Sequence, residues 1–162
     1  MRGDIVYKEL IQLDIEAENT DQVFEYMAGK LEEMGFVRPT FLEAIKKREK
    51  DYPTALGIEP YAVAIPHTDP DCIIRPFIAP IRLKKPVKWR EMTGTDVMYD
   101  VKFVFMLGFH KTEGQEGADA HIELLQILVQ NFQNAELMDK LDAAKSVDEY
   151  RKLILSMDGL EE

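Results

Sequence analysis

The stretch DVKFVFMLGF, residues 100–109, predicts a buried β-strand, because apolar and β-prone side chains fill most of this short run. Two further runs have the same character, YAVAIP at residues 61–66 and IIRPFIAPIRL at residues 73–83. Pro76 and Pro80 interrupt the longer run, and proline cannot donate to a β-ladder, so we expect an edge or bulged strand there. The middle of the chain therefore predicts a β-sheet.

Helical patterns precede and follow these strands, with apolar side chains recurring at helical spacing. The predicted helices cover residues 19–35, 39–52, 119–132, 135–145 and 146–157. Thr40 with Glu43, and Ser146 with Glu149, have the spacing of a capping box at a helix start. Gly35 fits the end of the first helix.

The remaining segments predict connections and one more strand. A short strand is expected within residues 9–17, a turn-rich connection at residues 84–96 and a glycine-containing loop at residues 110–119. No repeat or low-complexity tract divides the 162 residues, a length that suits one domain. We therefore expect a single α/β domain over residues 1–162, a sheet covered by helices.

The composition is that of a globular protein, with 46% hydrophobic and 31% charged residues. The formal net charge of −10 disfavours a nucleic-acid partner, since phosphate contacts need clustered Lys and Arg. It would attract a basic protein partner, but charge alone favours the alternative that it serves solubility. No apolar run approaches the roughly 18 residues of a membrane span, and the first residues lack the apolar core of a signal peptide. With Cys72 as the one cysteine, we expect no internal disulfide and a reducing, cytoplasmic location.

His67 follows the apolar run 61–66, at the strand end where open α/β sheets place their ligand crevices. Pro66 stiffens the backbone immediately before it. Asp69 and Asp71 are placed either to orient the imidazole or only to close the next turn. From this pattern alone, His67 is either a reactive histidine or a turn residue without a role.

His121 opens the helix predicted at residues 119–132, four residues before Leu125 on its buried face. If Asp119 caps that helix, the helix N-terminus keeps the imidazole neutral and attracts an anion such as a phosphoryl group. The alternative is a histidine at the edge of the core, bonded to a backbone carbonyl. His110 lies in the predicted loop and is interpreted as a solvated residue.

Other catalytic and cofactor motifs are missing from the sequence. Neither a His-Glu-x-x-His pattern nor paired cysteines predict zinc, and no glycine-rich phosphate loop or serine elbow is present. Cys72 begins an apolar strand and is expected to be buried rather than nucleophilic. We therefore expect no cofactor and no metal, with a metal site built from His67, His121 and nearby acids as the alternative.

Three segments, in their order and spacing, resemble a known family. They are AIKKREKDYPTALGIEPYAVAIPHTDP at residues 44–70, IAPIRLKKPVKW at residues 78–89 and HIELLQILVQNF at residues 121–132. Together they resemble the IIA component (EIIA) of the bacterial sugar phosphotransferase system (PTS), in its fructose/mannitol-type superfamily and nearest to the galactitol-type branch. The most specific feature is the pair Arg48 and Glu49, which leads to the motif AIPH.

The resemblance implies a phosphohistidine carrier with a mixed β-sheet flanked by helices on both faces. Members of the family accept a phosphoryl group from the phosphocarrier protein HPr and pass it to a cysteine of a IIB partner, which phosphorylates the sugar as the membrane component IIC imports it. By motif, His67 is implied as the phosphorylated residue, His121 as the second active-site histidine and Arg48 as the arginine near the phosphoryl group. A regulatory EIIA-like protein, whose phosphorylation state controls a partner, is the alternative that the same residues allow.

Overall fold

The computed structural model describes residues 2–109 and 114–160, and the strand predicted at residues 100–109 lies in the middle of its sheet. Within these residues the strands are β1 (Gln12–Ile15), β2 (Ala55–Leu56), β3 (Val63–Ala64), β4 (Phe77–Arg90) and β5 (Met98–Gly108). The α-helices are α1 (Thr20–Glu33), α2 (Phe41–Asp51), α3 (Gly114–Phe132), α4 (Ala135–Ala143) and α5 (Val147–Leu155). None of the helices in the described ranges combines the length and the apolar character that a membrane crossing requires.

The described strands pair in the order β1-β4-β5-β3-β2 and form a mixed sheet. β4 and β5 make a long antiparallel pair, which runs from Phe77 opposite Gly108 to Arg90 opposite Met98. β1 lies parallel to β4, and β3 lies parallel to β5. Parallel neighbours cannot be joined by a tight turn, and α1 and α2 lie in the segment that connects β1 to β4.

β4 differs from its sequence prediction in three ways. It is an interior strand between β1 and β5, so the edge position expected from its prolines is wrong. It also continues through residues 84–90, where the polar composition predicts a connection. Val87 and Trp89 are buried while Lys88 between them is exposed, which is the alternation of a strand. The β4–β5 register does shift, but between Arg82 and Val87, beyond both prolines, and Pro80 pairs in regular register with Phe105, so the bulge expected at the prolines is not there.

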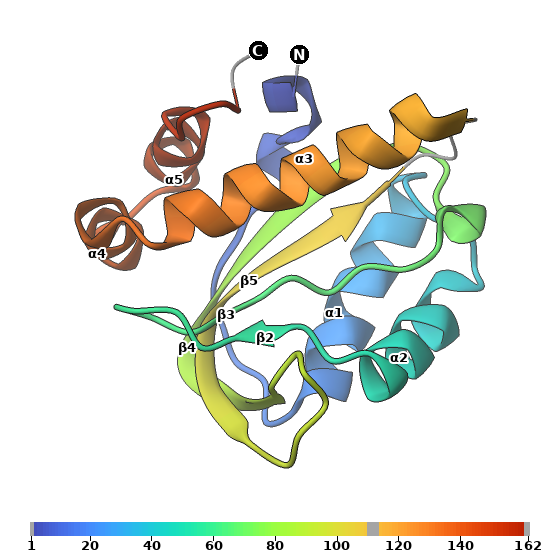
Figure 1. The fold of residues 1–162 in the computed structure, drawn as a ribbon, viewed down its shortest axis with the longest axis horizontal. Helices are drawn as coiled ribbons and strands as arrows, with labels where there is room; N and C mark the ends of the chain where they lie inside the picture. Colours follow the sequence, from blue (N-terminus) through green and yellow to red (C-terminus); the bar gives the residue numbers. More distant parts are fainter. Residues whose placement is uncertain (1, 110–113, 161–162) are drawn as a thin grey trace.

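Helices cover both faces of the sheet (Figure 1). On one face α1 and α2 pack against the sheet through side chains such as Phe24 and Ile45, which share a core with Trp89 of β4. On the other face α3, α4 and α5 pack through side chains such as Leu128, which share a core with Phe105 of β5. The predicted mixed sheet with helices on both faces is confirmed.

Local capping explains both ends of α1 and the start of α5. Asn19 accepts a 2.9 Å hydrogen bond from the backbone of the first turn of α1, and Gly35 beyond its end has a φ of +81°. Ser146 accepts a 3.1 Å hydrogen bond from the backbone of Glu149, so the cap predicted for α5 is confirmed. Thr40 makes no capping hydrogen bond, because its own backbone is already helical, and the capping box predicted there is wrong.

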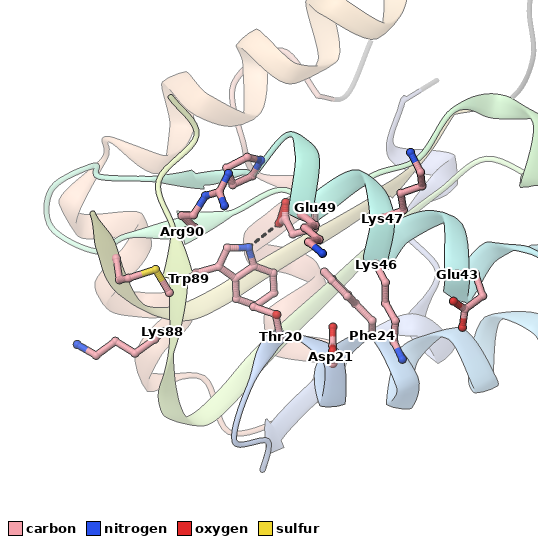
Figure 2. Close-up of a pocket in the computed structure, with 13 residues that line it drawn as sticks. Thr20, Asp21, Phe24, Glu43, Lys46, Lys47, Glu49, Lys88, Trp89 and Arg90 are labelled. Atoms are coloured by element: carbon pink, nitrogen blue, oxygen red, sulfur yellow. Dashed lines mark hydrogen bonds between the residues drawn. The ribbon is translucent and has the colours of Figure 1, made fainter. Parts of the chain in front are cut away.

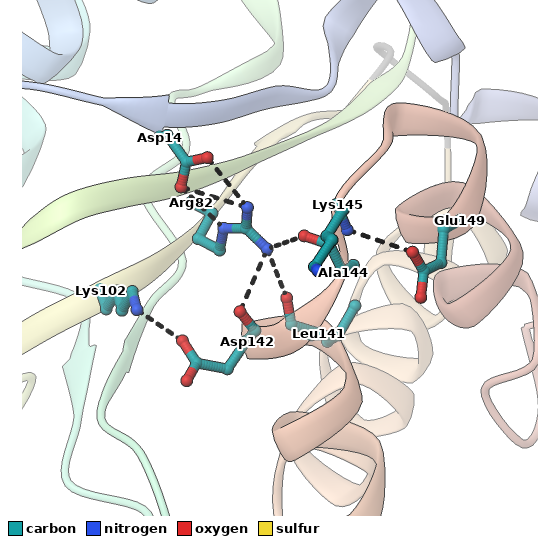
Figure 3. Close-up of polar contacts among 8 residues, drawn as sticks. All are labelled: Asp14, Arg82, Lys102, Leu141, Asp142, Ala144, Lys145 and Glu149. Atoms are coloured by element: carbon teal, nitrogen blue, oxygen red, sulfur yellow. Dashed lines mark hydrogen bonds and ion pairs between the residues drawn. The ribbon is translucent and has the colours of Figure 1, made fainter.

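Arg82 ties the edge strand β1 to the end of α4 (Figure 3). Its side chain is buried and donates to both carboxylate oxygens of Asp14 at 3.2 Å. It also donates to the carbonyl oxygens of Leu141 and Ala144 at 2.9 and 2.6 Å, and the end of a helix leaves such carbonyls without intrahelical partners. Asp14 has a φ of +57°, which aspartate tolerates better than most residues. The buried guanidinium of Arg82 thus pairs with a carboxylate of β1 and with backbone carbonyls at the end of α4.

Replacing Arg82 by alanine should lower the free energy of unfolding by about 3 kcal/mol, because buried carbonyls lose their donor and Asp14 loses its counter-ion. Urea unfolding followed by circular dichroism measures the change. Lys88→Ala is the control, since Lys88 lies on the same strand in an exposed ion pair with Asp100. This replacement should lower the free energy of unfolding by less than about 0.5 kcal/mol. Equal losses in the two variants would contradict the role of Arg82.

Candidate active site

His67 is held at the end of β3 by a hydrogen bond to its own backbone segment. The carbonyl of Pro66 accepts from the backbone N–H of Leu107 at 3.0 Å, so His67 lies at the carboxyl ends of the parallel strands β3 and β5. Nδ1 of its imidazole lies 2.8 Å from the carbonyl oxygen of Ile65. A carbonyl oxygen can only accept, so Nδ1 carries the proton and Nε2 keeps its lone pair. The ring therefore has a defined tautomer with Nε2 as its nucleophilic nitrogen.

The surroundings of His67 keep its imidazole neutral. Burial lowers the pKa of His67 below its usual 6.5, and the positive charge of Arg48 lowers it further. The hydrogen bond to Ile65 and the negative charge of Asp69 raise the pKa of His67, but they do not reverse the shift. A neutral imidazole near pH 7 is the form that can act as a nucleophile.

Arg48 of α2 pairs with Asp69 beside His67. Nη1 of Arg48 donates to Oδ1 of Asp69 at 2.9 Å, and its guanidinium lies 5.2 Å from the centroid of the Tyr52 ring. Arg48, Asp69 and Thr68 line a hollow of ≈ 230 Å³. The sequence left two roles open for Asp69, orientation of the His67 ring and closure of the next turn. The structure shows neither role for its carboxylate, because that carboxylate binds Arg48.

The phenyl ring of Phe109 contacts the imidazole rings of both histidines. Its ring centroid lies 5.7 Å from that of His67 in an edge-to-face contact, and 4.4 Å from that of His121 in a stacked contact. Phe109 itself is buried. Sequence reasoning missed this residue, although one signal was available: Phe109 ends the apolar run 100–109 at the same edge of the sheet as His67.

His121 comes from α3, but not from its first turn. The helix begins at Gly114, so the start predicted at Asp119 is wrong, and the expected effect of the helix N-terminus on His121 is wrong with it. Glycines in this segment predict a loop, yet the chain is helical there, because helix propensity is a weak preference that its context overrides. The predicted burial is confirmed in part, since His121 is half-buried, three residues before the buried Leu124. His110 lies outside the described residues.

Cys72 braces the turn that follows His67. Its buried Sγ lies 3.0 Å from Oγ1 of Thr68, and Thr68 donates to the carbonyl oxygen of Asp69 at 3.0 Å. The expected burial of Cys72 is confirmed. Within residues 2–109 and 114–160, no group of three or more His, Cys, Asp or Glu side chains lies close enough to hold a metal ion.

Nitrogen-15 NMR should find His67 protonated at Nδ1 and unprotonated at Nε2 at pH 7, because the Ile65 carbonyl can only accept a hydrogen bond. Titration should give a pKa below 6.5, since burial disfavours the charged form, so the neutral ring persists to a lower pH than in a free histidine. His67→Gln assigns the signal by removing it. A ring protonated at Nε2, or a pKa above 6.5, would contradict this geometry.

The chain resembles known proteins over most of its length. A family model described as "Phosphoenolpyruvate-dependent sugar phosphotransferase system, EIIA 2" matches residues 4–157. The mannitol-specific EIICBA component of the PTS from Vibrio cholerae is 27% identical over 150 residues, which are 91% of this chain and 21% of that protein. The fructose-specific EIIABC component from Bacillus subtilis is 30% identical over 147 residues, which are 90% of this chain and 21% of that protein. The chain thus spans 21% of the length of each relative.

Solved structures share the fold. The nitrogen regulatory protein IIA-Ntr from Neisseria meningitidis has a TM-score of 0.74 at 24% identity, over 94% of this chain and 97% of that chain. IIA mannitol from Escherichia coli has a TM-score of 0.71 at 22% identity, over 92% of this chain and 98% of that chain. Both likenesses confirm the mixed sheet with helices on its two faces. Because the family model matches residues 4–157, the chain belongs to the EIIA 2 family of the phosphoenolpyruvate-dependent sugar phosphotransferase system.

Proposed function

We propose that the chain is a phosphohistidine carrier of a sugar phosphotransferase system, with Nε2 of His67 as the atom that accepts the phosphoryl group. The observation that carries the proposal is the hydrogen bond to Ile65, which holds the Nδ1 proton across 2.8 Å and leaves Nε2 as the nucleophilic nitrogen. Burial lowers the pKa of His67, so the reactive neutral ring prevails near pH 7.

The proposed transfer exchanges one nitrogen–phosphorus bond for another and needs no cofactor. The lone pair of Nε2 forms a bond to phosphorus as the bond between phosphorus and the donor's histidine nitrogen breaks, and the donor leaves as a neutral imidazole. His67 keeps its Nδ1 proton and becomes positively charged, and the carbonyl dipole of Ile65 stabilises that charge. Catalysis of this kind depends on positioning and on charge stabilisation rather than on further covalent steps.

Two neighbouring side chains stabilise the transferred group in this proposal. Arg48 directs its permanent positive charge at the phosphoryl oxygens, and its ion pair with Asp69 holds the guanidinium beside the hollow until the group arrives. His121 donates a hydrogen bond to a phosphoryl oxygen from its ring. Phe109, which contacts the rings of both His67 and His121, keeps both rings in place.

The proposed phosphoryl donor is HPr, and the proposed acceptor is a IIB component, which serves the membrane component IIC indirectly. Multiphosphoryl transfer protein 1 of Escherichia coli is 28% identical over 148 residues. A structure titled as the complex of IIAMTL with phosphorylated IIBMTL from Escherichia coli shares this fold, with a TM-score of 0.72 at 22% identity. The net charge of −10 suits docking to basic protein faces and not to nucleic acid, and the proposed location is cytoplasmic.

The sugar and the biological role are finer proposals. The galactitol-type branch rests on the sequence resemblance, whereas the relatives described above are named for mannitol and fructose. Residues 1–162 are proposed to act as a single EIIA domain. In the regulatory alternative, the same phosphohistidine controls binding to a transporter, kinase or transcription regulator. Pull-down from the native host with phosphorylated and unphosphorylated chain separates the two roles, because a IIB protein is captured in one case and a regulator in the other.

Incubation with phosphoenolpyruvate, enzyme I and HPr should place one acid-labile phosphoryl group on His67. His67→Ala should abolish the label while retaining the circular dichroism spectrum of the wild type, because this side chain supplies the nucleophile. Phosphopeptide mapping under alkaline conditions identifies the labelled residue. Labelling that persists in His67→Ala would place the phosphoryl group on another residue.

His121→Ala and Arg48→Ala should each slow phosphoryl transfer from HPr by about 100-fold, as expected for the loss of one group that stabilises transition-state charge. Rapid-quench kinetics with radiolabelled HPr measures the rate. Gln126→Ala is the control for α3 and Lys47→Ala the control for α2, since both side chains are exposed on those helices. Transfer at the wild-type rate in either test variant would remove that residue from the proposed machinery.

A further inference from the structure

A second hollow, of ≈ 510 Å³, lies between α1, α2 and the end of β4 (Figure 2). Phe24, Lys50 and Arg90 line it, whereas His67, His121 and Arg48 do not. Glu49 lines it too, although it is the residue next to Arg48. Successive residues of an α-helix point about 100° apart, so α2 presents Arg48 to Asp69 on one side and Glu49 to this hollow on another.

The carboxyl of Glu49 has one satisfied oxygen and one without a partner. The residue is 8% exposed. Its Oε1 accepts from Nε1 of Trp89 and from Oγ1 of Thr54, both at 2.5 Å. Its Oε2 is buried and has no hydrogen-bond partner among the described residues. A buried carboxyl oxygen of this kind is costly to leave unpaired, which marks the hollow as a place where a hydrogen-bond donor is missing.

Two cations of the same hollow make no hydrogen bond or ion pair in the described part of the chain. Nε of Arg90 is buried without a hydrogen bond, although the charge of Arg90 acts on Glu49. Lys50 makes no ion pair within residues 2–109 and 114–160. The other lysines of the hollow are already paired: Lys46 with Glu25, Lys47 with Asp51 and Lys88 with Asp100. Asp21 and Glu43 also line the hollow, and their negative charges act on Lys46. Arg90 and Lys50 are therefore the two cations of the hollow that make no ion pair among the described residues.

We propose that this hollow binds a small hydroxylated anion, with the anionic group on Arg90 and Lys50 and a hydroxyl group on Oε2 of Glu49. A guanidinium and an ammonium suit a phosphate or a carboxylate equally well, so the shared chemistry is an anion that also carries alcohol groups. The volume lies within the range of pockets that bind small molecules, about 300–1,000 Å³. This binding site goes beyond the phosphoryl carrier proposed above and needs no phosphoryl group on His67.

The protonation of Glu49 is compatible with an anion. Burial raises the pKa of Glu49 to about 7, against the lowering effects of Thr54, Trp89 and Arg90. Near neutral pH a large fraction of the molecules therefore carries an uncharged carboxyl at the base of the hollow. A hydroxyl group of the ligand can pair with either protonation state of Glu49, because it can donate a hydrogen bond to the carboxylate and accept one from the carboxylic acid.

Isothermal titration of the full, unphosphorylated chain at pH 7 and low ionic strength tests the proposal with four probes. Sorbitol 6-phosphate and gluconate carry both required groups and distinguish a phosphate from a carboxylate, whereas methyl phosphate and sorbitol each carry one. Sorbitol 6-phosphate and gluconate are the two complete probes. At least one of them should bind saturably and about tenfold tighter than methyl phosphate or sorbitol. If none of the four binds saturably, or if methyl phosphate binds as tightly as both complete probes, the proposal is overturned.

Variants locate the binding. Arg90→Gln should weaken the complete probe at least about tenfold, and Glu49→Leu, which removes both carboxyl oxygens, should remove the advantage of that probe over methyl phosphate. Lys85→Ala, which removes an exposed lysine of β4 outside this hollow, should bind as the wild type does. Thermal unfolding checks that each variant is folded, and Arg90→Gln alone decides the question if Glu49→Leu is not. Equal affinity in Arg90→Gln and Lys85→Ala would overturn the assignment, and neither result depends on phosphorylation of His67.

Discussion

Burial of both faces of β5 is the constraint on which the rest of the structure depends. Alternate residues of this strand enter opposite cores, with Val104 and Met106 on the side of α1 and α2, and Phe103 and Phe105 on the side of α3 to α5. A strand with no polar face has to lie inside a sheet and needs helices on both sides. The long pairing with β4 and the parallel pairing with β3 follow from that interior position.

The same arrangement brings the residues of the proposed site to one edge of the sheet. Where β3 and β5 end, the chain places His67 after one strand and Phe109 after the other, and α3 adds His121, which stacks on the phenyl ring. The tautomer of His67 is set over a shorter range, by the carbonyl of Ile65 two residues earlier. Long-range strand pairing thus brings His67 and Phe109 together, and a local hydrogen bond decides which ring nitrogen of His67 keeps its lone pair.

α2 joins this site to the second hollow. Glu49 anchors the helix to β4 through Trp89, and the next residue toward the N-terminus, Arg48, extends in a different direction to Asp69. Two adjacent residues of one helix therefore contribute to two chemically distinct surroundings. Arg48 lines a hollow with Asp69, the residue two positions after His67, and Glu49 lines a hollow that holds both cations and carboxylates.

The sequence by itself determined the features that depend on local pattern. These are the helical and strand-like segments, the cap at Ser146, and a histidine at the end of an apolar strand. It misplaced β4 and the start of α3, because polar composition and glycine content describe local preference and not the burial that overrides it. Only the tertiary structure decided that Asp69 binds Arg48 rather than the imidazole, that Phe109 contacts both histidines, and that one oxygen of Glu49 is left without a hydrogen-bond partner among the described residues. The physical reason is that the groups concerned lie far apart in the chain. Only the folded sheet and its helices decide which of them come within reach of one another.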